Sequence, residues 1–188
     1  MTSFDPAQDR LRQAQGDREE PEIVWSGRFI EAKRLGKWEF VSRTRGVSAA
    51  VILAIDDGHV LLVEQYRVPL GARCLELPAG LVGDEAEGEE AGAAAIRELE
   101  EETGYRAGRA VDLGRYYASP GMSSEGFALL RAEELTKVGQ GGGVAGEDIE
   151  VHRVKLEEVA AFAARRREAG VAIDAKLLLL LGAGMLIP

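Results

Sequence analysis

The feature that most constrains the fold is a single helix-forming segment set between two groups of strand-forming segments. Residues 89–103 are rich in Ala, Glu, Leu and Arg, and Gly104 follows where a helix would end. β-Branched and other apolar residues dominate the flanking segments, which Gly, Pro and Asp punctuate. Such a chain is predicted to form a mixed sheet with helices packed against it, an α/β sandwich. The predicted strands cover residues 23–30, 37–43, 49–55, 59–66, 73–77, 110–117, 127–132 and 149–156.

Turn and cap residues place the ends of several segments. Asp57-Gly58 separates two predicted strands and is typical of a tight β-hairpin turn. Residues 156–169 predict a second helix, and Asp174 is suited to cap a last helix that runs to Leu181. The glycine-rich residues 139–146 are predicted to form a mobile loop.

Length and charge exclude several classes of protein. The chain has 188 residues, which suits one compact domain, and a net charge of −9. That charge disfavours binding to nucleic acid or to an anionic membrane, and no apolar stretch is long enough to cross a bilayer. Cys74 is the single cysteine, so an intramolecular disulfide is impossible and a reducing, cytoplasmic setting is expected. A phosphate-bearing substrate would need cations or local arginines to offset the negative field.

Carboxylates gather on one face of the predicted helix over residues 89–103. Glu98 and Glu102 are four residues apart, so they share a helical face, and Glu101 borders it. Like charges at this spacing destabilise an isolated helix by about 0.2–0.5 kcal/mol per pair. The acidic face is therefore either solvated or collects cations.

The wider spacing of these residues resembles the sequence box of the Nudix hydrolases. The pattern runs from Gly83 and Glu89 to Arg97-Glu98-Leu99, Glu101-Glu102 and Gly104. Relatives often begin the box at the glycine of a Pro-Ala-Gly turn, which here is Pro78-Ala79-Gly80, so the first glycine is either Gly80 or Gly83. The resemblance implies a Nudix-type α/β/α sandwich with a mixed sheet and a small N-terminal antiparallel strand region.

The same resemblance assigns roles to the box residues. It implies that Glu98 and Glu102 bind divalent metal, that Glu101 assists, and that the carbonyl of Ala79 is a further ligand. Two or three Mg²⁺ ions are implied, with Mn²⁺ as an alternative. Gly83, Glu89, Arg97 and Gly104 are implied to be structural, with Glu89 and Arg97 forming a pair.

Further segments resemble the ADP-ribose pyrophosphatases within that family. The resemblance implies that Arg67 contacts the substrate phosphates, that Pro120 marks the substrate class, and that Glu125 contacts the ribose side. These residues belong to the segments Glu64-Gln65-Tyr66-Arg67, Leu75-Glu76-Leu77-Pro78-Ala79-Gly80 and Ala118-Ser119-Pro120-Gly121-Met122-Ser123-Ser124-Glu125.

The N-terminal region is expected to recognise the base. Phe29 and Trp38 fall where similar enzymes stack adenine, with the two rings contributed by different subunits of a homodimer. Core packing of both rings is the alternative, and Trp25 is a rival for the stacking role. Glu39 would accept from the adenine amino group, and Arg43 would reach phosphate. The expected division is a flexible tail over residues 1–20, a strand region that subunits exchange over 21–46, and the Nudix domain over 47–188.

The general base is expected in the late loop. Glu147 matches the loop glutamate of relatives, which in some binds metal and in others activates water. Some relatives carry a second glutamate where this chain has Ala145, so Glu150 and Glu101 stay as alternatives.

Together these features predict metal-dependent hydrolysis of ADP-ribose to AMP and ribose 5-phosphate. Another nucleoside diphosphate sugar such as GDP-mannose is the alternative substrate. A noncatalytic ADP-ribose sensor is a third possibility, which the complete box and the charge of −9 disfavour.

Overall fold

The computed structural model describes residues 20–44, 48–82, 91–143 and 147–181. Its helices are α2 (Ala91–Thr103) and α3 (Val159–Glu168), with 3₁₀ turns η2 (Val68–Leu70), η3 (Leu156–Glu158) and η4 (Ala175–Leu177). Its strands are β1 (Glu22–Ser26), β2 (Ile30–Leu35), β3 (Trp38–Arg43), β4 (Ser48–Asp56), β5 (His59–Arg67), β6 (Ala72–Glu76), β7 (Ala79–Val82), β8 (Tyr105–Arg106), β9 (Arg109–Tyr117), β10 (Gly126–Glu133), β11 (Thr136–Lys137), β12 (Glu150–Lys155) and β13 (Ala172–Ile173).

The large sheet is mixed, as predicted. Its strand order is β13-β6-β5-β4-β10-β9, with β12 paired to β5 and β7 paired to β4. β4 runs parallel to β10 and β6 parallel to β13, whereas the other pairs are antiparallel. β4 and β5 pair beside their hairpin and then diverge, so that β4 continues against β7 and β5 continues against β6 and β12. The divergence separates the strands on either side of the cavity described below.

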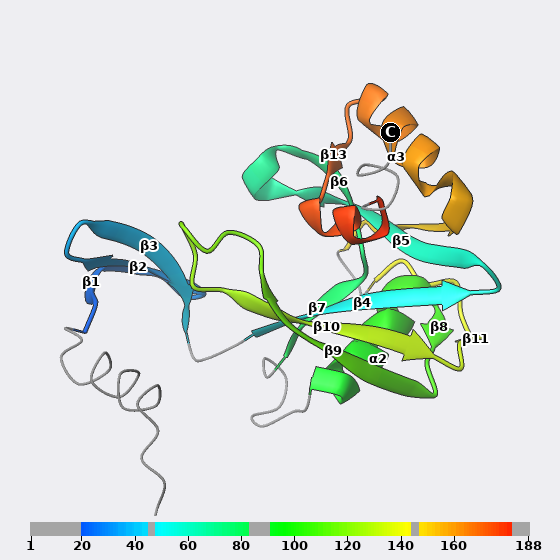
Figure 1. The fold of residues 1–188 in the computed structure, drawn as a ribbon, viewed down its shortest axis with the longest axis horizontal. Coiled ribbons are helices and arrows are strands. Elements are labelled where there is room, and N and C mark those ends of the chain that lie inside the picture. The colour runs from blue at the N-terminus through cyan, green and yellow to red at the C-terminus, as the bar shows by residue number, and fades with distance from the viewer. Residues whose placement is uncertain (1–19, 45–47, 83–90, 144–146, 182–188) are drawn as a thin grey trace, which may run out of the picture.

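Helices cover both faces of this sheet (Figure 1). Because side chains alternate along a strand, neighbouring residues of β4 enter different cores. Ile52 packs in a cluster with Leu99 of α2, whereas Val51 packs in a cluster with Val159 of α3. Burying a side chain of this size stabilises the fold by about 1.5–3 kcal/mol. The arrangement is the expected α/β/α sandwich.

The hairpin and cap predictions are confirmed. Asp57 and Gly58 have φ values of 46° and 70°, the conformation that a tight hairpin turn requires. Asp174 accepts a hydrogen bond from the Lys176 amide at 2.7 Å, and helical residues follow to 181. None of the helices in the described ranges is both long and apolar enough to cross a membrane.

One predicted strand is wrong. Residues 23–30 form two strands, because β1 ends at Ser26 and β2 begins at Ile30. The Gly27 amide donates to the Ile30 carbonyl at 2.9 Å, and a Cβ on Gly27 would lie 2.4 Å from the Trp25 ring. The chain therefore turns at Gly27, beneath the Trp25 ring.

The three N-terminal strands form a separate antiparallel sheet, β1-β2-β3, at one end of the molecule (Figure 1). This sheet adjoins the connection between β9 and β10. The Val41 amide donates to the Met122 carbonyl at 2.9 Å, and the Ser124 amide donates to the Val41 carbonyl at 3.0 Å. The N-terminal sheet is thus tied to the segment that carries Pro120 and Glu125.

Candidate active site

The carboxyl end of α2 is held by the glycine-rich segment that follows β11. Gly104 has a φ of +70° and its amide donates to the Glu100 carbonyl at 2.8 Å, so it ends the helix as predicted. The amides of Gly142 and Gly143 donate to the Glu102 and Glu101 carbonyls at 2.8 and 3.0 Å. The sequence predicted a mobile loop over residues 139–146, but its described part, 139–143, is tied to the helix that carries the acidic face.

Strand β7 packs directly against this acidic face. The Ala79 amide donates to Glu102 Oε2 at 3.1 Å, and the Glu102 residue is 5% exposed. A Cβ on Gly80 would lie 2.1 Å from Cγ of Glu98, so the absence of a side chain there makes room for that carboxylate. The close approach gives Gly80 a physical role, whereas Gly83 lies outside the described residues.

Burial raises the pKa of Glu102 to about 8, and the negative charges of Glu98 and Glu147 act in the same direction. The Ala79 hydrogen bond and the positive charge of Arg67 oppose this rise. Bound divalent cations would supply the missing positive charge, and carboxylate and carbonyl oxygens are the donors that hard cations prefer. Within the described ranges, no three His, Cys, Asp or Glu side chains are grouped closely enough to hold a metal ion by themselves. The oxygen donors of this face thus fit a hard divalent cation in chemistry.

Arg97 contacts two carboxylates of the acidic face. Its guanidinium lies 3.0 Å from Glu98 Oε1 and 3.5 Å from Glu101 Oε2. The predicted partner Glu89 lies outside the described residues. Arg97 therefore orients two carboxylates of the site, in addition to the role that the resemblance implies.

A cavity of about 380 Å³ opens beside β7, and several predicted site residues line it. Arg67 donates to Glu76 through Nε and Nη2, both at 2.7 Å, and Arg43 pairs with Glu125. Glu76 is 4% exposed and was not singled out in the sequence, although it lies within the quoted Leu75–Gly80 segment. Ala79 and Gly80 line the same cavity and also contact Glu102 and Glu98, so β7 lies between the cavity and the acidic face.

The expected base-stacking residues belong to the N-terminal strand region, where Phe29 precedes β2 and Trp38 begins β3. Trp38 and Pro120 line another hollow, of about 310 Å³. The two residues are 82 positions apart, so the sequence did not show that they lie together. Phe29 and Trp38 are 63% and 58% exposed, so the alternative of core packing is wrong. Trp25 is also exposed, and Glu39 pairs with Arg34 at 3.3 Å.

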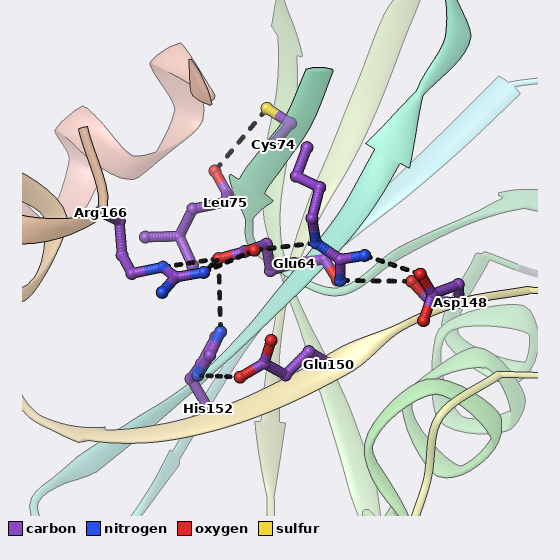
Figure 2. Close-up of polar contacts among 8 residues, drawn as sticks. Glu64, Cys74, Leu75, Asp148, Glu150, His152 and Arg166 are labelled. Atoms are coloured by element: carbon purple, nitrogen blue, oxygen red, sulfur yellow. Dashed lines mark hydrogen bonds and ion pairs between the residues drawn. The ribbon is translucent and has the colours of Figure 1, made fainter. Parts of the chain in front are cut away.

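The two candidate bases of the late loop lie in different surroundings. Glu147 is close enough to Glu102 to raise its pKa, and a Cβ on Gly143 would lie 2.3 Å from Glu147 Oε2. Glu150 instead lies 3.8 Å from His152 Nδ1, beside the buried Glu64 (Figure 2). The structure thus places Glu147 near the acidic face and Glu150 near another cluster. The His152 ring packs against the Phe162 ring, with 5.1 Å between the ring centroids.

Comparison with known proteins identifies the family of this chain. The sequence profile of the NUDIX domain matches residues 44–178. An ADP-ribose pyrophosphatase from Bacillus subtilis (strain 168) is 35% identical over 147 residues, which cover 73% of this chain and 77% of that protein. An ADP-sugar pyrophosphatase from Mus musculus is 49% identical over 121 residues, covering 55% of this chain and 54% of the relative, so the chain spans about half the length of that relative.

A solved structure supports the fold. The crystal structure of an ADP compounds hydrolase matches with a TM-score of 0.62 at 21% identity, covering 90% of this chain and 96% of that chain. Since the NUDIX domain match also covers well over half of the sequence, the chain belongs to the Nudix hydrolase family.

Proposed function

We propose that this protein hydrolyses the diphosphate bond of ADP-ribose to give AMP and ribose 5-phosphate. The observation that carries the proposal is the meeting of Arg43 and Arg67 with the Ala79–Gly80 strand in one cavity, against a helix bearing Glu98 and Glu102. Arginine matches phosphate geometry, and carboxylates on the opposite side match divalent cations. The names of the two pyrophosphatase relatives point to the same substrate class.

Arg67 and Arg43 orient the diphosphate. Glu76 holds two of the donors of Arg67, which fixes the plane of the guanidinium and leaves its other donors to the substrate. Glu125 accepts a hydrogen bond from Nε of Arg43, and its carboxylate is suited to accept from ribose hydroxyl groups. Glu76 and Glu125 therefore hold the two guanidinium groups in place before the substrate binds.

Glu98, Glu102 and the carbonyl of Ala79 would hold Mg²⁺, in two or three sites that Glu101 completes. When bound, the metal acidifies water and offsets the charge that develops on the phosphate oxygens. The protein's own contribution is to keep Glu98 against Gly80 and Glu102 against the Ala79 amide.

Glu147 takes the proton from the attacking water. Its position beside Glu102 favours it over Glu150, which faces His152. Glu101 is engaged by Arg97 at 3.5 Å, which favours a supporting role.

Exposed aromatic rings on the N-terminal sheet bind the adenine. Trp38 lies beside Pro120, and stacking on such a ring is worth about 1–3 kcal/mol per base. Phe29 of a second copy completes the clamp in a homodimer, with Glu39 near the adenine amino group. The expected cytoplasmic setting rests on the single, buried Cys74.

The test is turnover of a substrate panel by the purified protein with Mg²⁺ or Mn²⁺. We expect AMP from ADP-ribose, and slower turnover of GDP-mannose, which shares the diphosphate and differs in base and sugar. Glu98→Gln and Glu102→Gln should each lose turnover and bind ADP-ribose more weakly, at a level that calorimetric titration still measures. Absence of turnover across the panel, with binding retained in both variants, would instead identify a noncatalytic sensor.

A further inference from the structure

A buried ionic cluster outside the cavity joins four parts of the fold (Figure 2). Its centre is Glu64 of β5, which is 0% exposed. Arg166 of α3 donates to both carboxylate oxygens of Glu64, at 2.7 and 2.6 Å. His152 of β12 lies 3.6 Å from the same carboxylate. A carboxylate so deeply buried needs such partners, because an unpaired charge there would cost several kcal/mol.

Arg73 of β6 extends this cluster to the surface. It donates to Glu64 Oε1 at 2.9 Å and to the Glu64 carbonyl at 2.8 Å. Its remaining Nη1 donates to Asp148 at 2.7 Å. The Asp148 side chain is 88% exposed, so this last contact adds little to stability. Its effect is geometric, because Arg73 itself is fixed by a buried partner.

Asp148 directly follows Glu147 in the loop that reaches the acidic face. The described start of that loop is fixed by the amides of Gly142 and Gly143, which bond to carbonyls of α2. The end of the loop is fixed by Arg73. Glu147 therefore lies between two anchors, one on the helix that carries Glu102 and the other on the buried cluster.

We propose that Arg73 is a positioning residue for Glu147, acting through Asp148. This inference rests on the proposed function, in which Glu147 takes a proton from water. A displacement of about 1 Å in a catalytic group can cost about 100-fold in rate. Loss of the Asp148 carboxylate removes the 2.7 Å contact and leaves only the contact of 3.5 Å between Arg73 Nη2 and the Asp148 carbonyl, which loosens one end of the loop. The Glu64–Arg166 pair stays intact.

The experiment is a double-mutant cycle with Asp148→Ala, Glu147→Gln and the double variant. We expect Asp148→Ala to lower kcat about tenfold with KM within about twofold, and to have no further effect when Glu147 is Gln. Asp56→Ala is the matched control. It removes another aspartate that pairs with an arginine, Arg153 at 3.1 Å, at the end of β4, and it should leave kcat unchanged.

A second measurement does not depend on activity. Amide hydrogen exchange over residues 147–149 should become faster in Asp148→Ala and stay unchanged in Asp56→Ala. Unchanged exchange, or losses of kcat that multiply in the double variant, would overturn the proposal. If the wild-type protein turns over none of the sugar nucleotides, the proposed function fails, and the exchange result still decides whether Arg73 anchors the loop.

Discussion

The contact between Gly80 and Glu98 makes the sharpest prediction about the site. An added Cβ at residue 80 would lie 2.1 Å from Cγ, 2.2 Å from Cδ and 2.6 Å from Oε1 of Glu98. Carbon atoms in contact prefer about 3.5–4.0 Å, so the Gly80→Ala variant must displace the Glu98 side chain by more than about 1 Å. The strand backbone accepts alanine, because Gly80 lies in β7 and is not among the glycines with positive φ.

Such a displacement should cost activity far more than stability. A shift of about 1 Å in a ligand or catalytic group can lower the rate by about 100-fold. We expect Gly80→Ala to lower kcat/KM for ADP-ribose by about 100-fold, close to the loss in Glu98→Gln. The free energy of unfolding should change by less than about 1 kcal/mol, because the atoms that the added Cβ meets belong to one side chain and not to the backbone.

The assay compares Mg²⁺-dependent release of AMP with urea unfolding in each variant. Gly92→Ala is the matched control, since it adds the same methyl group on α2 and meets Ala110 Cβ at an ordinary 3.9 Å. It should keep full activity. Wild-type turnover in Gly80→Ala, or an equal loss in Gly92→Ala, would refute the reasoning.

Three further predictions test other parts of the structure. Arg67→Lys keeps the charge but loses the two-donor contact with Glu76, so steady-state kinetics should show KM raised by about tenfold. Gly104→Ala and Gly58→Ala share a φ of +70°, but only a Cβ at Gly104 would lie 2.4 Å from the Gly139 carbonyl oxygen. In urea unfolding, Gly58→Ala should lower the free energy of unfolding by roughly 1–2 kcal/mol, the cost of the left-handed backbone alone. Gly104→Ala should lower it by more, and equal losses in the two variants would contradict the close packing at Gly104. Burial alone would raise the pKa of Glu64, but hydrogen bonds from its two arginines hold that pKa below the ordinary 4.5. As the pH falls below about 4.5, Glu64 takes up its proton more readily in the unfolded chain than in the folded protein. The stability that the ionised Glu64 contributes is therefore lost in acid. Glu64→Gln should be about 3 kcal/mol less stable than the wild-type protein at pH 7, and this difference in the free energy of unfolding should narrow in acid. A difference that stays constant from pH 7 to 3 would contradict this role of Glu64.

Local patterns in the sequence predicted those parts of the site that lie on one element. The spacing of four residues placed Glu98 and Glu102 on one face of α2, and Gly104 marked the end of that helix. Each of these predictions depends on geometry within a few neighbouring residues, which the local sequence specifies without contacts from distant segments. The hairpin turn at Asp57-Gly58 is of the same kind.

Contacts between distant segments were not predictable in this way. Glu64 and Arg166 are 102 residues apart, and nothing in either neighbourhood specifies the other. Glu76 reads as one more strand residue until Arg67 of the neighbouring strand is seen to donate to it. Periodicity identifies which face of a strand is buried, but pairing across the sheet depends on register, which one sequence does not specify.

The balance of charge in the cavity leads to a last prediction, about metal removal. Among the described residues, three cations and three carboxylates line the cavity, and each cation is paired: Arg43 with Glu125, Arg67 with Glu76, and Lys176 with Asp174.

Walls balanced in this way orient a diphosphate but attract it weakly, and the charge of −9 repels it at longer range. We therefore expect divalent ions on the acidic face to supply the attraction. In Glu147→Gln, which keeps Glu98 and Glu102, calorimetric titration should show ADP-ribose binding weakened at least about tenfold when EDTA replaces Mg²⁺, a loss of about 1.4 kcal/mol. Equal affinity with and without the ion would mean that the paired arginines, rather than the acidic face, draw the substrate into the cavity.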